Sequence, residues 1–401
     1  MNCRSCFIQD IFSIIPLGAM PLANGLLKTA GQEEGRYNLE VMLCQQCGLA
    51  QLKDLIDPAV LFSEYVYFSS NSSTMLKSVQ NLVSQLIPSL PSDALVLEVA
   101  SNDGYLLKNY VEKGISVLGI DPAQNIAHYA NQQGIPTRAE FFNKDYALQL
   151  VAENLYADII HANNVMAHVP DIHGFIAGLK IILKKGGQII IEVPYLLDLV
   201  ENFEFDTIYH EHVYYFGVKP LRRIFLEYGL EIVDIEKISL HGGSLRLFIQ
   251  HQGEKKHNSF VDKLEAYEIK KGLYEHATYR RLMEHISLLK SNLKKTIQQF
   301  KNQGKKVAAY GASAKGATLL NFFAINSQDI DFVVDISSAK QNFYMPGVRI
   351  PIRPTQALVD ENIDAALLLT WNFSQEILQQ QEFFRQQGGK FIIPFPHVRV
   401  V

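Results

Sequence analysis

Apolar and polar positions along the chain follow periods that predict two α/β units. From Leu95 to about Arg246, apolar runs of strand length alternate with amphipathic stretches of helical length, as a parallel sheet covered by helices requires. An amphipathic helix is expected before this region, at about residues 75–90. The charge-rich stretch from about 254 to 303 has no proline and predicts helices that lead to a second α/β unit beginning near Lys305.

The composition is typical of a folded protein with two or three domains. The chain has 401 residues, 48% of them hydrophobic and 19% charged, and a formal net charge of −4. This small charge, together with the lack of any lysine or arginine run, argues against nucleic acid as a general partner.

The chain also lacks the features of a membrane protein. No uninterrupted apolar run reaches the roughly 18 residues of a membrane-spanning helix. The most apolar N-terminal stretch, residues 11–27, is interrupted by prolines, a glycine and an asparagine, so we interpret it as packed structure and not as a signal peptide. A cytoplasmic protein is expected.

All four cysteines lie in the first 47 residues, as the pairs Cys3/Cys6 and Cys44/Cys47. Two residues between thiolates let each pair take one edge of a tetrahedron, and Gly48 relieves the tight turn after the second pair. The pattern therefore predicts structural zinc that stabilises a small segment. Iron in the same tetrahedron, a redox dithiol and two disulfides are the alternatives.

A candidate cofactor site follows the first strand of the α/β region. The stretch 94–107 runs from an apolar strand into an acidic turn and then a helix, with Glu98 and Asp103 at the strand's end and Gly104 permitting close backbone approach. The next strand, 116–120, ends at Asp121, where an acid can bind both hydroxyls of a ribose. One glycine and an acid suit S-adenosylmethionine, with its cationic sulfonium, better than the pyrophosphate of a dinucleotide. An ordinary βαβ crossover with polar turn residues is the alternative.

A third strand, at 157–160, leads to the same edge of the predicted sheet. Asn163 and Asn164 follow it and can hold polar groups of a cofactor, while His168 can face the substrate. The candidate cofactor residues are Glu98, Ser101, Asn102, Asp103, Gly104, Tyr105, Asp121, Pro122, Asn163 and Asn164.

The densest group of reactive side chains is Tyr209, His210, Glu211 and His212. In an extended segment the two histidines would share one face, whereas in a loop all four side chains could converge on one substrate. General acid/base chemistry is favoured because imidazole titrates near neutrality and a neighbouring carboxylate can orient it. A metal site and a structural hydrogen-bond knot are the alternatives.

The second α/β unit opens with another candidate ligand loop, Tyr310 to Gly316. It follows a strand and begins a helix, so its N–H groups and Lys315 are expected to face an anion, and Asp335 ends the next strand. The loop matches neither a Walker loop nor a dinucleotide fingerprint, and NAD, a sugar nucleotide or no ligand remain open. Trp371 and Asn372 follow a further strand, where the indole would stack on a base or pack at a rim.

Taken together, these motifs resemble those of the deoxysugar C-methyltransferases, which place a methyl group on C3 of a nucleotide-linked 4-keto-6-deoxyhexose. The resemblance runs nearly end to end. It rests on the cysteine pairs with Pro21-Leu-Ala-Asn24, Tyr65-Val-Tyr-Phe68, the cofactor loop, Asn163 to His168, Tyr209 to His212, His241-Gly-Gly-Ser-Leu-Arg246, Tyr310 to Gly316, and Trp371-Asn372. It implies a zinc-binding domain over residues 1–72, a Rossmann-like methyltransferase domain that binds S-adenosylmethionine over 73–253, and a helical connector with a Rossmann-like domain for the nucleotide sugar over 254–401.

The resemblance also implies roles for individual residues. His212 would remove the C3 hydrogen, with Glu211 orienting or tuning it, and Tyr209 and His168 would bond the enolate oxygen or neighbouring hydroxyls. Tyr65 or Tyr67 would close the site from the N-terminal side. The implied substrate-binding residues are His210, His241, Ser244, Arg246, Tyr310, Gly311, Ala312, Lys315, Asn321, Asp335, Trp371 and Asn372.

Two other hypotheses keep the same folds. The chain could be an NAD-dependent oxidoreductase or epimerase that uses the loop at Tyr310, or a zinc-containing binding protein without turnover. The dense cluster at residues 209–212 weighs against the latter. For the methyltransferase the expected partner is a nucleotide-linked sugar, usually carried on thymidine in the resembled family. A monomer is expected because three joined domains can enclose both ligands.

Overall fold

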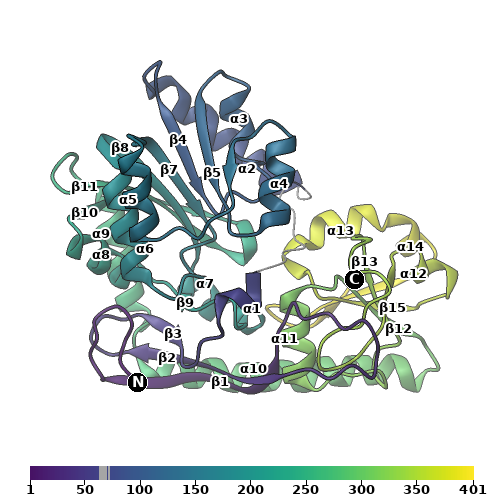
Figure 1. Cartoon of the computed structure of the whole chain (residues 1–401). Coiled ribbons are helices and arrows are strands. Elements are labelled where there is room, and N and C mark those ends of the chain that lie inside the picture. The colour runs from purple at the N-terminus through teal and green to yellow at the C-terminus, as the bar shows by residue number, and fades with distance from the viewer. Residues whose placement is uncertain (63–69, 71–72) are drawn as a thin grey trace.

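The computed structural model describes residues 1–62, 70 and 73–401, and these form three β-sheets (Figure 1). The N-terminal sheet has the antiparallel order β1-β2-β3-β9. Its strands are β1 (Ile11–Pro21), β2 (Arg36–Cys44), β3 (Ala50–Leu52) and β9 (Tyr214–Tyr215). β1 comes from the apolar stretch 11–27, as the interpretation of that stretch as packed structure requires, whereas β9 lies far along the chain. The short helix α1 (Pro58–Phe62) follows β3.

The central sheet has seven strands in the order β10-β11-β8-β7-β4-β5-β6. The five strands from β8 to β6 are parallel, and β11 and β10 extend the sheet antiparallel. Their bounds are β4 (Leu95–Val99), β5 (Ser116–Ile120), β6 (Thr137–Arg138), β7 (Ala157–Asn163), β8 (Leu183–Pro194), β10 (Leu230–Ile238) and β11 (Ser244–His251). The strand order reverses between β4 and β7, and a crevice at such a point is where open α/β sheets bind ligands.

Helices of the expected kind alternate with these strands. The amphipathic helix predicted at 75–90 is α2 (Ser73–Leu86), followed by the 3-10 turn η2 (Ile87–Ser89). The other helices of the central unit are α3 (Lys108–Val111), α4 (Gln124–Gln132), α5 (Lys144–Ala152), α6 (Ile172–Ile182), α7 (Leu196–Glu201) and α8 (Val218–Glu227). Two 3-10 turns also matter below: η3 (Phe205–Thr207) and η4 (Leu240–Gly242).

The charge-rich stretch forms the helices α9 (Ser259–Lys270) and α10 (His276–Asn302). The apolar stripe of α10 is buried and packs against β1, and both elements run along the base of the molecule in Figure 1. Beyond α10 lies the C-terminal unit, which comprises elements β12 to β17. Its sheet has the order β14-β13-β12-β15-β16-β17, parallel except for β17.

The strands of the C-terminal unit are β12 (Val307–Tyr310), β13 (Val333–Asp335), β14 (Ile352–Pro354), β15 (Ala365–Leu368), β16 (Lys390–Ile393) and β17 (Arg399–Val400). Its helices are α11 (Ala314–Phe323), α12 (Ala357–Asp360), α13 (Ser374–Gln380) and α14 (Glu382–Gln386), with the turn η5 (Trp371–Phe373). The predicted class is therefore confirmed: an α/β protein with a cysteine-bearing N-terminal part and two Rossmann-like sheets. Among the described residues, no helix is both long and apolar enough to cross a membrane.

Candidate active site

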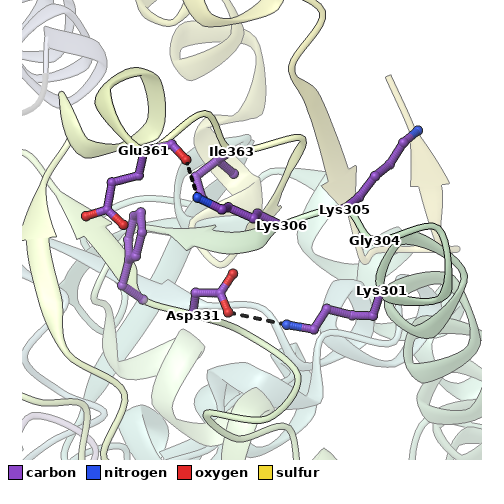
Figure 2. Close-up of a pocket in the computed structure, with 8 residues that line it drawn as sticks. Lys301, Gly304, Lys305, Lys306, Asp331, Glu361 and Ile363 are labelled. Carbon is purple, nitrogen blue, oxygen red and sulfur yellow. Dashed lines mark hydrogen bonds and ion pairs between the residues drawn. The ribbon is translucent and has the colours of Figure 1, made fainter.

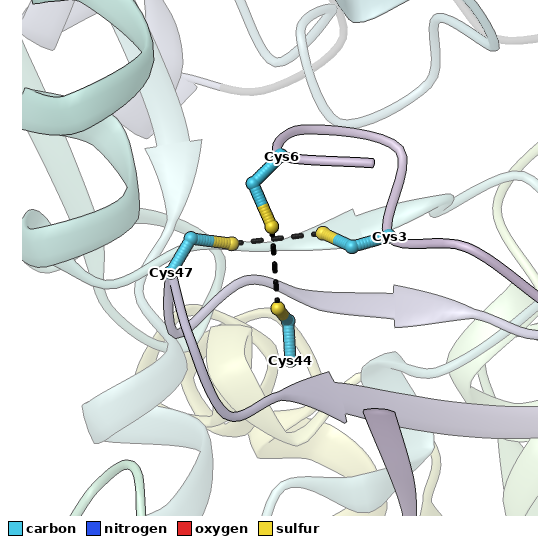
Figure 3. Close-up of side chains that lie close together, drawn as sticks. All are labelled: Cys3, Cys6, Cys44 and Cys47. Atoms are coloured by element: carbon cyan, nitrogen blue, oxygen red, sulfur yellow. Dashed lines mark hydrogen bonds between the residues drawn. The ribbon is translucent and has the colours of Figure 1, made fainter. Parts of the chain in front are cut away.

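The four cysteines converge from two turns at one end of the N-terminal sheet (Figure 3). Their Sγ atoms all lie within 4.8 Å of one another, with 3.6 Å between Cys3 and Cys47 and 3.5 Å between Cys6 and Cys44. A tetrahedral zinc with Zn–S bonds of about 2.3 Å places its sulfurs about 3.8 Å apart, so the cluster has the size of a zinc site. It is the only tight group of metal-ligating side chains in the described parts of the chain, so the alternative metal site at residues 209–212 gains no support.

The carboxyl ends of β4, β5 and β7 meet where the sequence places the cofactor. Asp121 follows β5 and accepts N–H bonds from Asn102 and Ala123, each at 2.9 Å, which ties the turn after β4 to the end of β5. The turn itself is unusual, since Ala100, Asn102 and Gly104 all have positive φ, and sparsely populated backbone conformations of this kind cluster at functional sites.

This edge of the central sheet carries several carboxylates close together. Burial, and then the charges of Asp103 and Asp121, raise the pKa of Glu98 well above its usual value. Burial also raises the pKa of Asp121. The site is therefore electronegative and favours a cationic ligand.

Tyr209 and His212 form the reactive pair of the 209–212 cluster. Residues 208–213 form a turn, in which His212 Nδ1 lies 2.8 Å from the carbonyl oxygen of Thr207 and Nε2 lies 2.8 Å from the Tyr209 hydroxyl. A carbonyl only accepts, so Nδ1 carries the proton and the lone pair is on Nε2. His212 thus presents a base whose tautomer is set by main chain.

His168 packs against this base. Its ring lies edge-on to that of His212, with 4.8 Å between ring centroids. Burial lowers the pKa of His168 to about 4, so the ring is neutral at pH 7. A neutral His168 ring does not repel a proton on His212, whereas a charged His168 ring would.

The other two members of the cluster bond to the N-terminal region and not to His212 Nδ1 or Nε2. Both oxygens of the Glu211 carboxyl accept hydrogen bonds from the Asn24 side chain, at 2.8 and 2.9 Å, so Thr207 and not Glu211 orients His212. Burial raises the pKa of Glu211 to about 7. His210 is buried beside Tyr37, with Nε2 3.3 Å from its carbonyl oxygen. The turn thus pairs Tyr209 with His212 and directs His210 and Glu211 to the N-terminal region.

A cavity of about 560 Å³ lies between the central and C-terminal units. Trp371 and Asn372 line it on one side and Glu204 with the Gly242 turn on the other. The indole N–H of Trp371 donates to Asp206 at 2.7 Å, and Lys315 lies 4.6 Å above its ring. Trp371 and Lys315 thus take part in the contact between units, and Trp371 and Asn372 both line the cavity.

The His241-Gly-Gly-Ser-Leu-Arg246 motif proves to be largely structural. Arg246 is buried and binds Glu192 at 2.8 Å, Glu236 at 3.1 Å and Ser78 at 3.0 Å, and the Ser244 hydroxyl donates to the Leu240 carbonyl. Neither is available to a substrate, which corrects the expectation for both. The two glycines have positive φ and pack so tightly that an added Cβ would collide with Glu204 or Asp198. The backbone of His241 lies in η4, and its side chain falls outside what the structure describes.

The loop from Tyr310 to Gly316 also makes more hydrogen bonds within the protein than expected. The N–H groups of Gly311, Ala312, Ser313 and Gly316 already bond to protein acceptors, and Asp335 receives those of Ala312 and Ser337 at 2.7 and 2.8 Å. Asp335 therefore ties loop to strand as Asp121 does in the central sheet. Tyr310 is buried in the core, and Asn321 holds the carbonyls of Ala317 and Pro346, so these two are corrected to structural roles.

Another hollow, of about 360 Å³, lies at the opposite end of the C-terminal sheet (Figure 2). Lys301 reaches Asp331 and Lys306 reaches the Glu361 carbonyl across it. Because it borders the amino ends of β12 and β13, it is not at the edge where such sheets bind ligands. Tyr65 and Tyr67, the expected closing residues, lie outside the described residues.

Comparison with known proteins decides the family. The chain is 33% identical over 405 residues to the C-methyltransferase NovU of Streptomyces niveus, with 100% of this chain and 96% of that protein covered. The chain belongs to the C-methyltransferase family. The resemblance inferred from the motifs is thereby confirmed at this level.

Three family descriptions match successive parts of this C-methyltransferase. They are a zinc binding domain at residues 3–62, a methyltransferase domain at 73–235 and a C-methyltransferase C-terminal domain at 239–396. Solved structures that are similar to part of it include magnesium protoporphyrin IX methyltransferase from Synechocystis PCC 6803 with bound SAM, at 17% identity, covering 44% of this chain and 79% of that one, with a TM-score of 0.35. Another is an S-adenosylmethionine-dependent methyltransferase from Clostridium acetobutylicum, at 14% identity, 44% and 92% coverage, and a TM-score of 0.36.

The residues of this C-methyltransferase fit its cofactors, S-adenosylmethionine and zinc. Within the described residues, buried polar atoms without a protein partner gather at the cofactor edge: Glu98 Oε2, Ser101 Oγ, Asp103 Oδ1 and both amide atoms of Asn163. Buried polar groups are costly when unpaired, so such a group of atoms marks a ligand's place. Three acids there match the positive sulfonium, and the four thiolates match zinc.

Sequence reasoning missed two functional residues of this C-methyltransferase. Asn24 holds Glu211 across 187 positions, and only its presence in the resembled Pro21-Leu-Ala-Asn24 motif could have indicated it. Thr207 acts through its carbonyl oxygen, a group that every residue has, so no side-chain pattern could have identified it.

Proposed function

We propose that this S-adenosylmethionine-dependent C-methyltransferase acts on C3 of a nucleotide-linked 4-keto-6-deoxyhexose, with thymidine diphosphate as the carrier, through an enolate. The observation that carries this proposal is the His212 imidazole with its Nδ1 proton on the Thr207 carbonyl and its Nε2 lone pair beside Tyr209. A sugar carbon becomes nucleophilic only after losing a proton, and a ketone at C4 acidifies the hydrogen on C3 enough for a positioned base to remove it.

His212 Nε2 accepts that proton, the electrons of the C3–H bond form the C3=C4 bond, and the π electrons of the C4 carbonyl move onto its oxygen to give the enolate. In the free enzyme the Tyr209 hydroxyl donates a hydrogen bond to Nε2. During the reaction the same hydroxyl would donate to the enolate oxygen. S-adenosylmethionine supplies an electrophilic methyl group at its sulfonium when bound. The residues at the cofactor edge, among them Glu98, Asp103 and Asp121, would hold this cofactor, and fixing two ligands beside each other can supply much of the rate enhancement.

The division of the chain supports the assignment of ligands to units. We take residues 1–72 as the zinc domain, 73–253 as the cofactor domain and 254–401 as connector and nucleotide-sugar domain. The cavity between the last two, with Asn372 on its wall, is large enough for part of such a substrate. We also propose a cytoplasmic monomer, because these units enclose both ligands within one chain.

Mass spectrometry of a panel of nucleotide-linked 4-keto-6-deoxysugars, incubated in deuterated water with enzyme and S-adenosylmethionine, tests the proposal. The expected result is a gain of one methyl group on the sugar, reduced about 10² to 10⁴-fold by His212→Gln. The exposed His128 offers a matched control, His128→Gln. Deuterium exchange at C3 without methylation would support the role of the base but show that the acceptor sugar is wrong. The absence of both exchange and methylation with every sugar would refute the proposal.

A further inference from the structure

The short segment that orients His212 is held mainly by the C-terminal unit. This segment, residues 205–208, comprises the turn η3 and Ile208. Phe205 is buried among Phe322, Phe323 and Phe395, with ring centroids 5.3, 5.0 and 5.9 Å away. All three partners come from the C-terminal unit, although the segment precedes the catalytic turn of the central unit.

Polar contacts from the C-terminal unit hold the residues on both sides of Thr207. The Trp371 indole donates to Asp206 Oδ2 at 2.7 Å, and the Thr318 hydroxyl donates to the carbonyl oxygen of Ile208 at 3.1 Å. Between these two anchors lies Thr207, whose carbonyl oxygen binds His212 Nδ1. A peptide group held by hydrogen bonds at both neighbouring residues has little freedom to rotate its own carbonyl.

The charges around Asp206 strengthen this anchor. Asp206 is fully buried, and the half-buried Lys315 lies near it, near Glu204 and over the Trp371 ring. Desolvation raises the pKa of Asp206, and the nearby Lys315 charge and the Trp371 N–H act in the opposite direction. Removing the indole N–H would therefore leave a buried carboxyl short of a partner and release the turn.

We propose that Trp371 and Thr318 are positioning residues for His212, through which the C-terminal unit sets the orientation and tautomer of the catalytic base. Both act through the residues on either side of Thr207. The base is thus correctly presented only while the C-terminal unit is docked on residues 205–208. The same contact between units therefore forms the cavity beside Trp371 and orients His212 for proton removal. This inference rests on the assignment of His212 as the base in the proposed function.

The test combines two conservative variants with a readout that needs no substrate. Trp371→Phe keeps an aromatic ring but removes the indole N–H, and Thr318→Val keeps the shape but removes the hydroxyl. The control is Arg349→Met, which breaks a contact of the C-terminal unit with Ala30 and Glu34 of the N-terminal region, away from the base. In ¹⁵N-histidine-labelled protein, long-range ¹H–¹⁵N spectra report which ring nitrogen of His212 is protonated, with His212→Gln used for assignment.

Wild type and Arg349→Met are expected to show His212 with its proton on Nδ1, whereas both test variants shift toward a mixture of tautomers. If a methyl acceptor is found, kcat should fall by up to about 10²-fold in both variants, with the acid limb of the pH profile displaced. Thr318 does not line the cavity, so Thr318→Val should change KM for both ligands little. Unchanged His212 spectra in both test variants would overturn the inference even if methyl transfer is observed. Changed spectra without methyl transfer to any sugar would instead leave the positioning role intact and refute the proposed reaction.

Discussion

Glu211 makes the stability of this enzyme depend on pH in a direction opposite to that of most carboxylates. Glu211 is 5% exposed, and burial raises the pKa of its carboxyl from 4.5 to about 7, against the opposing effect of the Asn24 hydrogen bonds. Between these two pH values the folded protein binds more protons than the unfolded chain. Stability contributed by Glu211 is therefore complete below pH 4.5 and is lost as the pH rises through about 7.

The size of the effect follows from the shift. A difference of this size in pKa corresponds to about 3 kcal/mol, at roughly 1.4 kcal/mol per pH unit. Glu211→Gln keeps the shape and an acceptor oxygen for Asn24 but cannot ionise. The variant is expected to gain about 3 kcal/mol relative to wild type between pH 4.5 and pH 8.

Urea unfolding of wild type, Glu211→Gln and Glu140→Gln at a series of pH values measures this difference, since other titrating groups cancel. Glu140 is an exposed glutamate and serves as the matched control. The ¹³C shift of the Glu211 carboxyl carbon gives its titration directly. Parallel stability curves for wild type and Glu211→Gln, or a carboxyl that titrates near its usual value, would show that the contact with the N-terminal region does not desolvate Glu211.

Two further predictions concern the zinc cluster and Arg246. Removing zinc with a chelator, or replacing one ligand by Cys44→Ser, should unfold the N-terminal sheet and abolish activity, because β9 of that sheet directly follows residues 209–212. Metal analysis with circular dichroism measures the loss of zinc and of structure. Preserved activity in metal-free protein would contradict the prediction. Arg246→Met should destabilise the fold by about 3 to 5 kcal/mol, because it strands the buried Glu192. Kinetics of the surviving folded enzyme should show an unchanged KM for the sugar, and a raised KM would restore Arg246 as a substrate residue.

The parts of this molecule that the sequence predicted are those whose signals are local. The cysteine pairs and the turn between β4 and α3 each lie within a few consecutive residues, and strand ends such as Asp121 follow from the alternation of strands and helices. The carboxyl ends of parallel strands meet at one edge whatever the loops do, so Glu98, Asp121 and Asn163 could be grouped without a structure.

The remaining site residues depend on tertiary packing that no local pattern records. The cluster at residues 209–212 was recognised by its crowding, but which side chain faces which way depends on Asn24 and Thr207. Arg246 and Ser244 were assigned to the substrate through a resemblance, and a motif does not distinguish a binding residue from one that holds the site's frame. Trp371 and Asp206 are 165 positions apart, and only the docking of two units brings them together.

The pairing of β3 with β9 also has a consequence for how the chain is made. The zinc ligands have all left the ribosome soon after residue 47, but the strand that completes their sheet, β9, ends at Tyr215. At 5 to 20 residues per second, the nascent N-terminal segment waits roughly 10 to 30 s with an open strand edge at β3. An open edge invites pairing with another chain, so early metal capture would protect the youngest part of the protein during synthesis. Zinc supply during translation would then determine how much of this enzyme reaches its folded state.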